Sequence, residues 1–120
     1  MISIILIIFL LCGIYLFYEN TTVQITNYSI SNIKVPEDFN DYRIIQISDF
    51  HNTTSQKLTN DLINKIKEQK PDIIVLTGDL IDSRNTKIDI AISFIKQIID
   101  VAPVYYVTGN HEARIDKYWI

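Results

Sequence analysis

The chain has a single cysteine, Cys12, which lies inside an apolar segment near the amino terminus. An intramolecular disulfide is therefore impossible, and a metal site built from several thiolates is excluded. Glycine is also scarce, and no glycine-rich turn of the dinucleotide-binding kind follows the first predicted strand. Lysine and arginine are scattered and the net charge is −3, so no nucleic-acid-binding surface is evident and no protein partner is predicted.

Charge is missing altogether from residues 2–18, which are almost entirely apolar. The length of this run is at the short end of the range that spans a bilayer as a helix. No basic residue precedes it and no small-residue cleavage site follows it, which favours an uncleaved anchor over a signal peptide. We therefore expect residues 1–18 to form one transmembrane helix of a single-pass membrane protein. The first basic residue after the run is Lys34, so orientation is poorly determined; the uncharged amino terminus favours the remaining chain lying outside the cytoplasm.

Residues 19–42 are expected to contain an edge strand and a loop. Apolar residues alternate partially over Thr21–Ile30, as they do in strands at the edge of a sheet. Pro36, with aspartate and asparagine residues close behind it, marks the loop.

Three later runs, rich in β-branched and aromatic residues, predict strands. They are Arg43–Ser48, Ile73–Thr77 and Val104–Thr108, and their lack of polar alternation predicts burial on both faces. Apolar residues recur at helical spacing in Ser55–Lys70 and Lys87–Asp100, which separate these runs. The order β-α-β-α-β predicts an α/β fold with a mainly parallel sheet. Both helices are expected on one side of it, because such crossovers are right-handed.

Polar side chains follow each predicted strand, at the point where the strand ends. Since ligand sites of parallel sheets lie beyond the carboxyl ends of the strands, these side chains should meet at one edge. Neighbouring carboxylates repel unless a cation offsets them, and imidazoles beside them complete an oxygen and nitrogen ligand set. The sequence therefore predicts a metal site, with candidates Asp49, His51, Asp79, Asp82, Asn110 and His111.

Each candidate also has a structural interpretation. A single aspartate after a strand is usually a turn or helix cap, and a single histidine there is usually a hydrogen-bonded surface residue. The glycines oppose this interpretation for the second and third clusters, since Gly78 and Gly109 directly precede Asp79 and Asn110 and glycine permits close approach to a ligand. For Asp82 and Glu112 a cap or a salt bridge remains equally open, and the D-x-H strand end leaves a structural role open for His51.

The clusters D-x-H, G-D-x-x-D and G-N-H-E, from Asp49 to Glu112, resemble the calcineurin-like metallophosphoesterases, above all their single-span, membrane-associated bacterial members. The resemblance implies that residues 43–120 are the amino-terminal part of a metallophosphoesterase sandwich. It also implies a dinuclear centre of two divalent metal ions, such as manganese, iron or zinc.

The resemblance assigns the metal ligands residue by residue. Asp49 and His51 would bind the first ion. Asp79 would bridge both ions with its carboxylate. Asn110 would bind the second ion through its side-chain oxygen.

The remaining matched residues would act around the metals. His111 would stand beside the scissile phosphate as the catalytic proton donor to the leaving group. Asp82 and Glu112 would orient the ligands through hydrogen bonds.

These roles together predict a metal-dependent hydrolase of phosphomonoester, phosphodiester or pyrophosphate bonds that uses no organic cofactor. The apolar amino terminus favours a lipid-linked or cell-envelope phosphorylated substrate. Family members take further histidine ligands from later strands, whereas this chain has two histidines in all, so these 120 residues alone are expected to be inactive. The alternative is a non-catalytic, membrane-tethered module that binds a metal ion or a phosphate.

Overall fold

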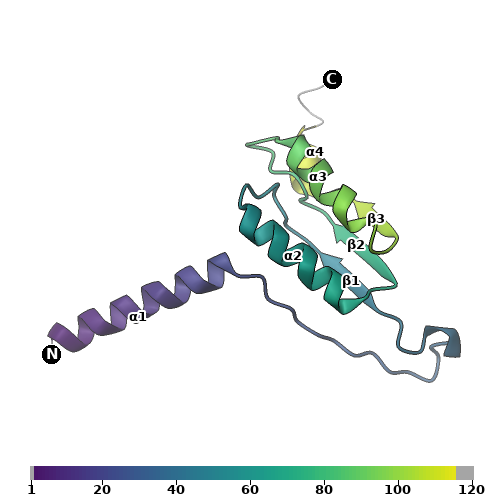
Figure 1. Ribbon diagram of the computed structural model, residues 1–120, viewed down its shortest axis with the longest axis horizontal. Helices are drawn as coiled ribbons and strands as arrows, with labels where there is room; N and C mark the ends of the chain where they lie inside the picture. Colours follow the sequence, from purple (N-terminus) through teal and green to yellow (C-terminus); the bar gives the residue numbers. More distant parts are fainter. Residues whose placement is uncertain (1, 116–120) are drawn as a thin grey trace.

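The computed structural model describes residues 2–115 of the chain (Figure 1). It confirms the predicted β-α-β-α-β order, and adds a short 3-10 helix before it and a short α-helix after it. In chain order the elements are α1 Ile2–Thr21, η1 Glu37–Phe39, β1 Ile44–Ile47, α2 Gln56–Gln69, β2 Ile73–Thr77, α3 Ile88–Ile98, β3 Val104–Val107 and α4 Asn110–Ile115.

Helix α1 stands apart from the rest of the chain and packs little of its surface (Figure 1). Its large apolar side chains between Ile4 and Tyr18 are each at least 50% exposed. The hydroxyl groups of Thr21 and Thr22 donate hydrogen bonds to the carbonyls of Phe17 and Tyr18 at its carboxyl end. The sequence predicts a transmembrane helix over residues 1–18; within residues 2–115, no helix reaches the combined length and apolarity needed to cross a membrane.

The edge strand predicted between residues 19 and 42 is absent from the structure. Residues 22–32 form an irregular chain that pairs with none of the described strands, and Tyr28 and Ile30 are exposed. A strand is stable only when a neighbouring strand satisfies its backbone groups, so partial alternation of apolar residues was an insufficient signal here. The predicted loop is present, and it contains η1.

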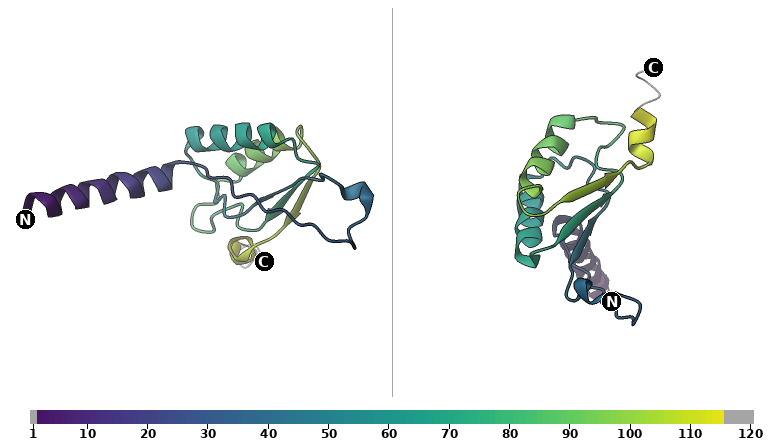
Figure 2. Two further views of the ribbon diagram at one scale, coloured as in Figure 1. Left: turned by 90° about the horizontal axis from the view of Figure 1, so that it is seen from below. Right: turned by 90° about the vertical axis from the view of Figure 1, so that its right-hand side faces the viewer.

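The sheet has the order β1-β2-β3 and both pairs of strands are parallel. Helices α2 and α3 lie side by side on one face of it, as the right-handed crossovers predict, whereas α4 lies beyond the opposite face (Figure 2). The core between the sheet and the helix pair is centred on side chains with almost no exposed surface. They are Ile66, Ile74, Phe94 and Ile98.

The other face of the sheet is open, so the prediction of strands buried on both faces is wrong for the described residues. Neighbouring side chains of a strand point to opposite faces, and α2 and α3 cover only one of them. Ile44, Tyr105 and Val107 are 59%, 61% and 61% exposed. Val75, in the middle strand β2, is paired with Tyr105 of β3 and therefore lies on the same open face.

Candidate metal centre

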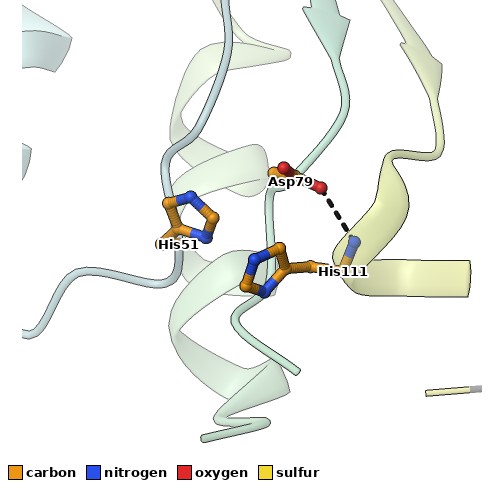
Figure 3. A group of neighbouring side chains, drawn as sticks. All are labelled: His51, Asp79 and His111. Carbon is orange, nitrogen blue, oxygen red and sulfur yellow. Dashed lines mark hydrogen bonds between the residues drawn. The ribbon is translucent and has the colours of Figure 1, made fainter. Parts of the chain in front are cut away.

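Three segments far apart in sequence meet at the carboxyl edge of the sheet. His51 follows β1, Asp79 follows β2, and His111 lies in the first turn of α4, just after β3. Each of these side chains offers a ligand atom, and the three atoms lie within 4.8 Å of one another (Figure 3). The parallel topology alone explains this arrangement, because it brings every strand end to the same edge.

The backbone of this edge has unusual torsion angles. Asp49, His51, Asn52 and Asp79 have φ values of 57°, 49°, 36° and 51°, in the left-handed region that costs a residue with a side chain on the order of 1–3 kcal/mol. Hydrogen bonds between the two loops oppose this cost: the N–H groups of Asp49 and His51 donate to the carbonyls of Gly78 and Asp79, over 3.3 and 3.0 Å. Such strain is typical of functional sites held in shape by their surroundings.

Two glycines allow the loops after β2 and β3 to touch. A Cβ at Gly109 would lie 2.2 Å from Asp79 Oδ1, and a Cβ at Gly78 would lie 2.8 Å from the Gly109 Cα. Gly78 also has a φ of 95°, which favours glycine. Both positions therefore require glycine for space, and Gly78 requires it for conformation as well.

His51 is placed as a metal ligand would be. Its Nε2 lies 3.4 Å from Asp49 Oδ1, and its ring centre lies 4.6 Å from that of His111. Its Nδ1 is buried and has no hydrogen-bond partner among the described residues, a state that normally costs about 1–3 kcal/mol. The His51 imidazole and the Asp49 and Asp79 carboxylates are nitrogen and oxygen ligands of the kind that suit a divalent transition metal, so the residues present fit the predicted ion.

His111 is fixed from the loop after β2. Its Nδ1 accepts a hydrogen bond from the Ser83 N–H over 3.1 Å and lies 3.4 Å from Asp82 Oδ1. A nitrogen that accepts a backbone N–H carries no proton in the neutral ring, so the ring proton of neutral His111 is on Nε2. Its backbone N–H donates to Asp79 Oδ1 over 2.9 Å, the bond drawn in Figure 3.

Asp82 makes the salt bridge that the sequence left open. The Arg84 guanidinium donates to both oxygens of this carboxylate, over 3.1 and 3.0 Å. These hydrogen bonds lower the pKa of Asp82 from 3.8 to about 2, and the same pair raises the pKa of Arg84. Asp82 therefore keeps its negative charge beside His111 well into the acid range.

Glu112 lies behind the ligand cluster and is 8% exposed. Its carboxylate accepts the backbone N–H groups of Asp79, Ile81 and Gly109, over 3.0, 2.9 and 2.7 Å. Burial raises its pKa, but these backbone donors outweigh burial and the net pKa is lowered. Burial and the nearby Glu112 charge in turn raise the pKa of Tyr106 to about 12.

The remaining predicted ligands lie at the border of the cluster. The Asp49 side chain is exposed and accepts the Ser48 hydroxyl over 2.5 Å, while its other oxygen faces His51. Asn110 is an exposed residue at the start of α4, directly before His111. The structure thus brings His51, Asp79 and His111 together; Asp49 faces His51, and Asn110 directly precedes His111 in the chain.

Asn52 belongs to this edge and sequence reasoning missed it. It is buried; its amide nitrogen donates to the Asn85 carbonyl over 2.7 Å and its amide oxygen accepts the Asp82 N–H over 2.6 Å. It therefore joins the loop after β1 to the loop after β2. Its position just after D-x-H was the available signal, because asparagine tolerates a positive φ better than most residues.

A cavity of about 680 Å³ opens beside the cluster. Asp49, His51 and Asp82 line one part of it, and Leu58 and Leu62 of α2 line another. The edge therefore combines metal-binding groups with space for a small molecule.

These features define a class: an α/β domain with a cluster of oxygen and nitrogen ligands for divalent metal at the carboxyl edge of a parallel sheet. Residues 42–119 match the family model of the calcineurin-like phosphoesterases. The chain belongs to this family, as the three sequence clusters predict.

Proteins with related sequences carry the same family name. The chain is 31% identical over 81 residues, 66% of its length, to a transmembrane protein with metallophosphoesterase domain from Danio rerio. It is 26% identical over 104 residues, 83% of its length, to an uncharacterized metallophosphoesterase of Campylobacter jejuni. It is 35% identical over 72 residues, 58% of its length, to another from Bacillus subtilis. The matched parts span only 18%, 28% and 25% of these relatives.

Proposed function

We propose that the protein to which this chain belongs hydrolyses phosphoester bonds, using divalent metal held at the carboxyl edge of the sheet. The observation that carries the proposal is the meeting of His51, Asp79 and His111 within 4.8 Å, from three separate strand ends. Membership of the phosphoesterase family supports the same chemistry.

The proposed ligands divide between two ions. Asp49 and His51 would hold one ion, Asn110 would hold the other, and the Asp79 carboxylate would serve both. Bound divalent metal would supply an activated water molecule and positive charge for the phosphoryl oxygens. Manganese, iron and zinc all suit these ligands.

The side chain of His111 would supply the proton that the leaving group needs. His111 has its Nδ1 occupied by the Ser83 N–H, so its Nε2–H is free to protonate the oxygen of the leaving group. The Asp82 carboxylate, held ionised by Arg84, lies 3.4 Å from His111 Nδ1.

The first test is metal binding and turnover in matched variants. Calorimetric titration with Mn²⁺ should show binding to the wild type, weakened by about tenfold or more in His51→Ala and Asp79→Asn. The control Asp89→Asn, in an exposed position on α3, should bind normally. Absence of Mn²⁺ binding to the folded wild type would refute the proposed metal site.

Turnover is measured with the complete protein, since the chain spans 28% or less of the three relatives described above. A generic aryl phosphodiester should be hydrolysed only when Mn²⁺ is present, and Asp79→Asn should abolish nearly all of this activity because one carboxylate serves both ions. Metal binding without turnover of any phosphoester would instead favour the non-catalytic binding module.

We also propose that α1 attaches the protein to a membrane, with the α/β domain outside the cytoplasm and a lipid-linked or cell-envelope phosphoester as substrate. The apolar surface that α1 exposes over residues 4–18, which carry no charged side chain, supports attachment, as do relatives named as transmembrane proteins. Deleting residues 1–18 should move the protein from the membrane fraction to the supernatant. Extraction of the intact protein at alkaline pH separates a spanning helix, which stays, from one lying on the surface, which is released. Unchanged fractionation of the deletion variant would contradict attachment through α1.

A further inference from the structure

The chain segment directly after α1 is held against helix α2. Residues 21–23 are half-buried, whereas residues 24–44 are all exposed. The Lys65 ammonium group of α2 donates hydrogen bonds to the Val23 carbonyl over 2.6 Å and to Asp61 Oδ2 over 2.8 Å. Hydrogen bonding to Lys65, and further to the backbone of Val23, lowers the pKa of Asp61. Asp61 and Lys65 together thus fix the backbone of Val23 beside α2.

Val23 also lines the cavity next to the ligand cluster. Asp49 and His51 contribute metal-binding groups to this lining, and Val23, Leu58 and Leu62 contribute apolar side chains. No lysine or arginine is among the described residues that line it. A phosphoryl group held at the cluster would therefore have apolar side chains beside its organic substituent, and no cation there to bind a second phosphate.

The segment that leaves α1 connects this cavity with the surroundings of α1. The end of α1 lies beside α2 (Figure 1, Figure 2). A second cavity, of about 520 Å³, is lined by residues of both helices, among them Tyr18 and Lys65, and also by Val23. Since Val23 lines both cavities, the attachment proposed for α1 would bring the apolar part of the first cavity close to the membrane surface.

We propose that Val23, Leu58 and Leu62 form an apolar wall that binds the organic substituent of the phosphoester. Lys65 is a positioning residue, which acts by holding Val23 in this wall. The inference rests on the proposed function, because it takes the phosphoryl group to lie at the metal cluster. It adds the residues that select the substrate: an ester with an apolar chain attached close to phosphorus, rather than one with a second charged group there.

A simpler interpretation is that Asp61 and Lys65 only stabilise α2. The two residues are four positions apart on the helix, and such pairs add a little stability to a helix on their own. This interpretation gives no role to the third partner, the Val23 carbonyl. It also predicts that Lys65 has no effect on the binding of a ligand in the cavity.

The test uses two probes that differ only in chain length, methylphosphonate and hexylphosphonate. Both keep the phosphoryl oxygens and neither has an ester bond to hydrolyse. Each methylene group that becomes buried strengthens binding by about fourfold. In calorimetric titrations, the complete protein loaded with Mn²⁺ should therefore bind hexylphosphonate at least about 20-fold more tightly than methylphosphonate.

Variants of the wall should lower this ratio of affinities. Val23→Asp and Leu58→Gln should lower it by about fivefold or more, while the binding of Mn²⁺ and of methylphosphonate stays as in the wild type. Ile25→Asp is the matched control, because Ile25 is exposed in the same segment and lies outside the cavity lining. Lys65→Met, which frees the Val23 carbonyl, should lower the ratio by about threefold or more. Lys67→Met, an exposed change on the same helix, should leave it unchanged.

Two results would show that the inference is wrong while metal binding stands. One is equal binding of the two phosphonates by the wild type, and the other is an equal effect of Val23→Asp and Ile25→Asp on the ratio. A wild type that binds neither Mn²⁺ nor methylphosphonate would instead refute the proposed function, on which the inference rests.

The contact between Lys65 and Val23 is tested on the wild type without any variant. The Lys65 ammonium group is half-buried and has two acceptors, so acetic anhydride should modify it at least about threefold more slowly than the exposed Lys67. Mass spectrometry of proteolytic peptides measures both rates. Equal rates would show that Lys65 does not hold Val23 and would overturn its positioning role.

Discussion

At the scale of single residues, Asp79 is constrained by its own backbone, by Gly109 and by Glu112. The sequence predicted that Asp79 follows a strand and belongs to the site, since G-D-x-x-D after a β-branched run indicates both. It gave no sign of the positive φ at Asp79 or of the bonds between the two loops. These depend on which loops become neighbours, and only the assembled sheet determines that.

Gly109→Ala tests the close approach of the two loops. The added methyl group would lie 2.2 Å from Asp79 Oδ1, so the loops must separate, at a cost of about 1–3 kcal/mol. Urea denaturation should show this loss, and Mn²⁺ binding should weaken with it. Gly13→Ala is the matched control, because nothing lies within 4 Å of a Cβ there. Equal stability of the Gly109 variant and the wild type would contradict the described packing.

Arg84→Ala tests the charge state of Asp82. Arg84 lowers the pKa of Asp82 from 3.8 to about 2, so the pair stabilises the fold fully above the ordinary pKa and loses this contribution as pH falls through the lower value. The variant keeps the bond from the backbone N–H of residue 84 to Asp82, so its Asp82 pKa should rise above the wild-type value of about 2 and stay below 3.8 in a carbon-detected NMR titration of the carboxyl group. Thermal melts should show less loss of stability between about pH 4 and pH 2 in the variant than in the wild type. Lys96→Ala, an exposed change on α3, should leave the Asp82 titration unchanged.

At the scale of elements, the three strands and the two long helices follow from the spacing of apolar residues, and the structure has them close to the predicted bounds. Ser55 accepts the Leu58 N–H at the start of α2, and Lys70 ends it in a left-handed conformation just before Pro71. The short helix α4 was missed because its G-N-H-E segment was interpreted as a strand-end cluster. The reach-back from Glu112 to Gly109 shows that this segment is also a helix start.

Helix α3 packs against the loop after β1, which carries Asp49 and His51. Phe94, on its buried face, stacks on Phe50, with ring centres 4.3 Å apart, and Phe50 stands between Asp49 and His51 in the chain. Phe94→Ala should lower the free energy of unfolding by about 3–5 kcal/mol, measured by urea denaturation. Ile92→Ala, on the exposed side of the same helix, should cost much less. A similar loss in both variants would mean that α3 does not pack as described.

At the scale of the whole molecule, the described chain is a sheet with one covered face and one open face. The topology predicted both helices on one side, and the exposed Ile44, Tyr105 and Val107 are the consequence. The apolar composition of the strands nevertheless predicted burial on both faces. The apolar composition shows that both faces of these strands are suited to contact with other apolar groups. Among the described residues, only α2 and α3 provide such contact, and they cover one face.

The open face should make the isolated 120-residue chain self-associate, because exposed apolar surface of this kind drives aggregation. Tyr105→Lys with Val107→Lys should lower the apparent mass in light scattering and reduce the binding of a hydrophobic dye. Lysines at exposed Asn64 and Gln97 of the helices serve as the control for added charge. A wild-type chain that stays monomeric at high concentration would contradict this expectation.

The reciprocal ties between the loops after β2 and β3 also bear on the order of folding. These hydrogen bonds join residues 31 to 33 positions apart, so each closes a long stretch of chain and has to wait for the intervening crossover helix. Contacts that form after the transition state influence the rate of unfolding far more than the rate of folding. The bonds between the loops that carry Asp79 and His111 thus contribute to the lifetime of the folded domain rather than to the speed at which it is reached.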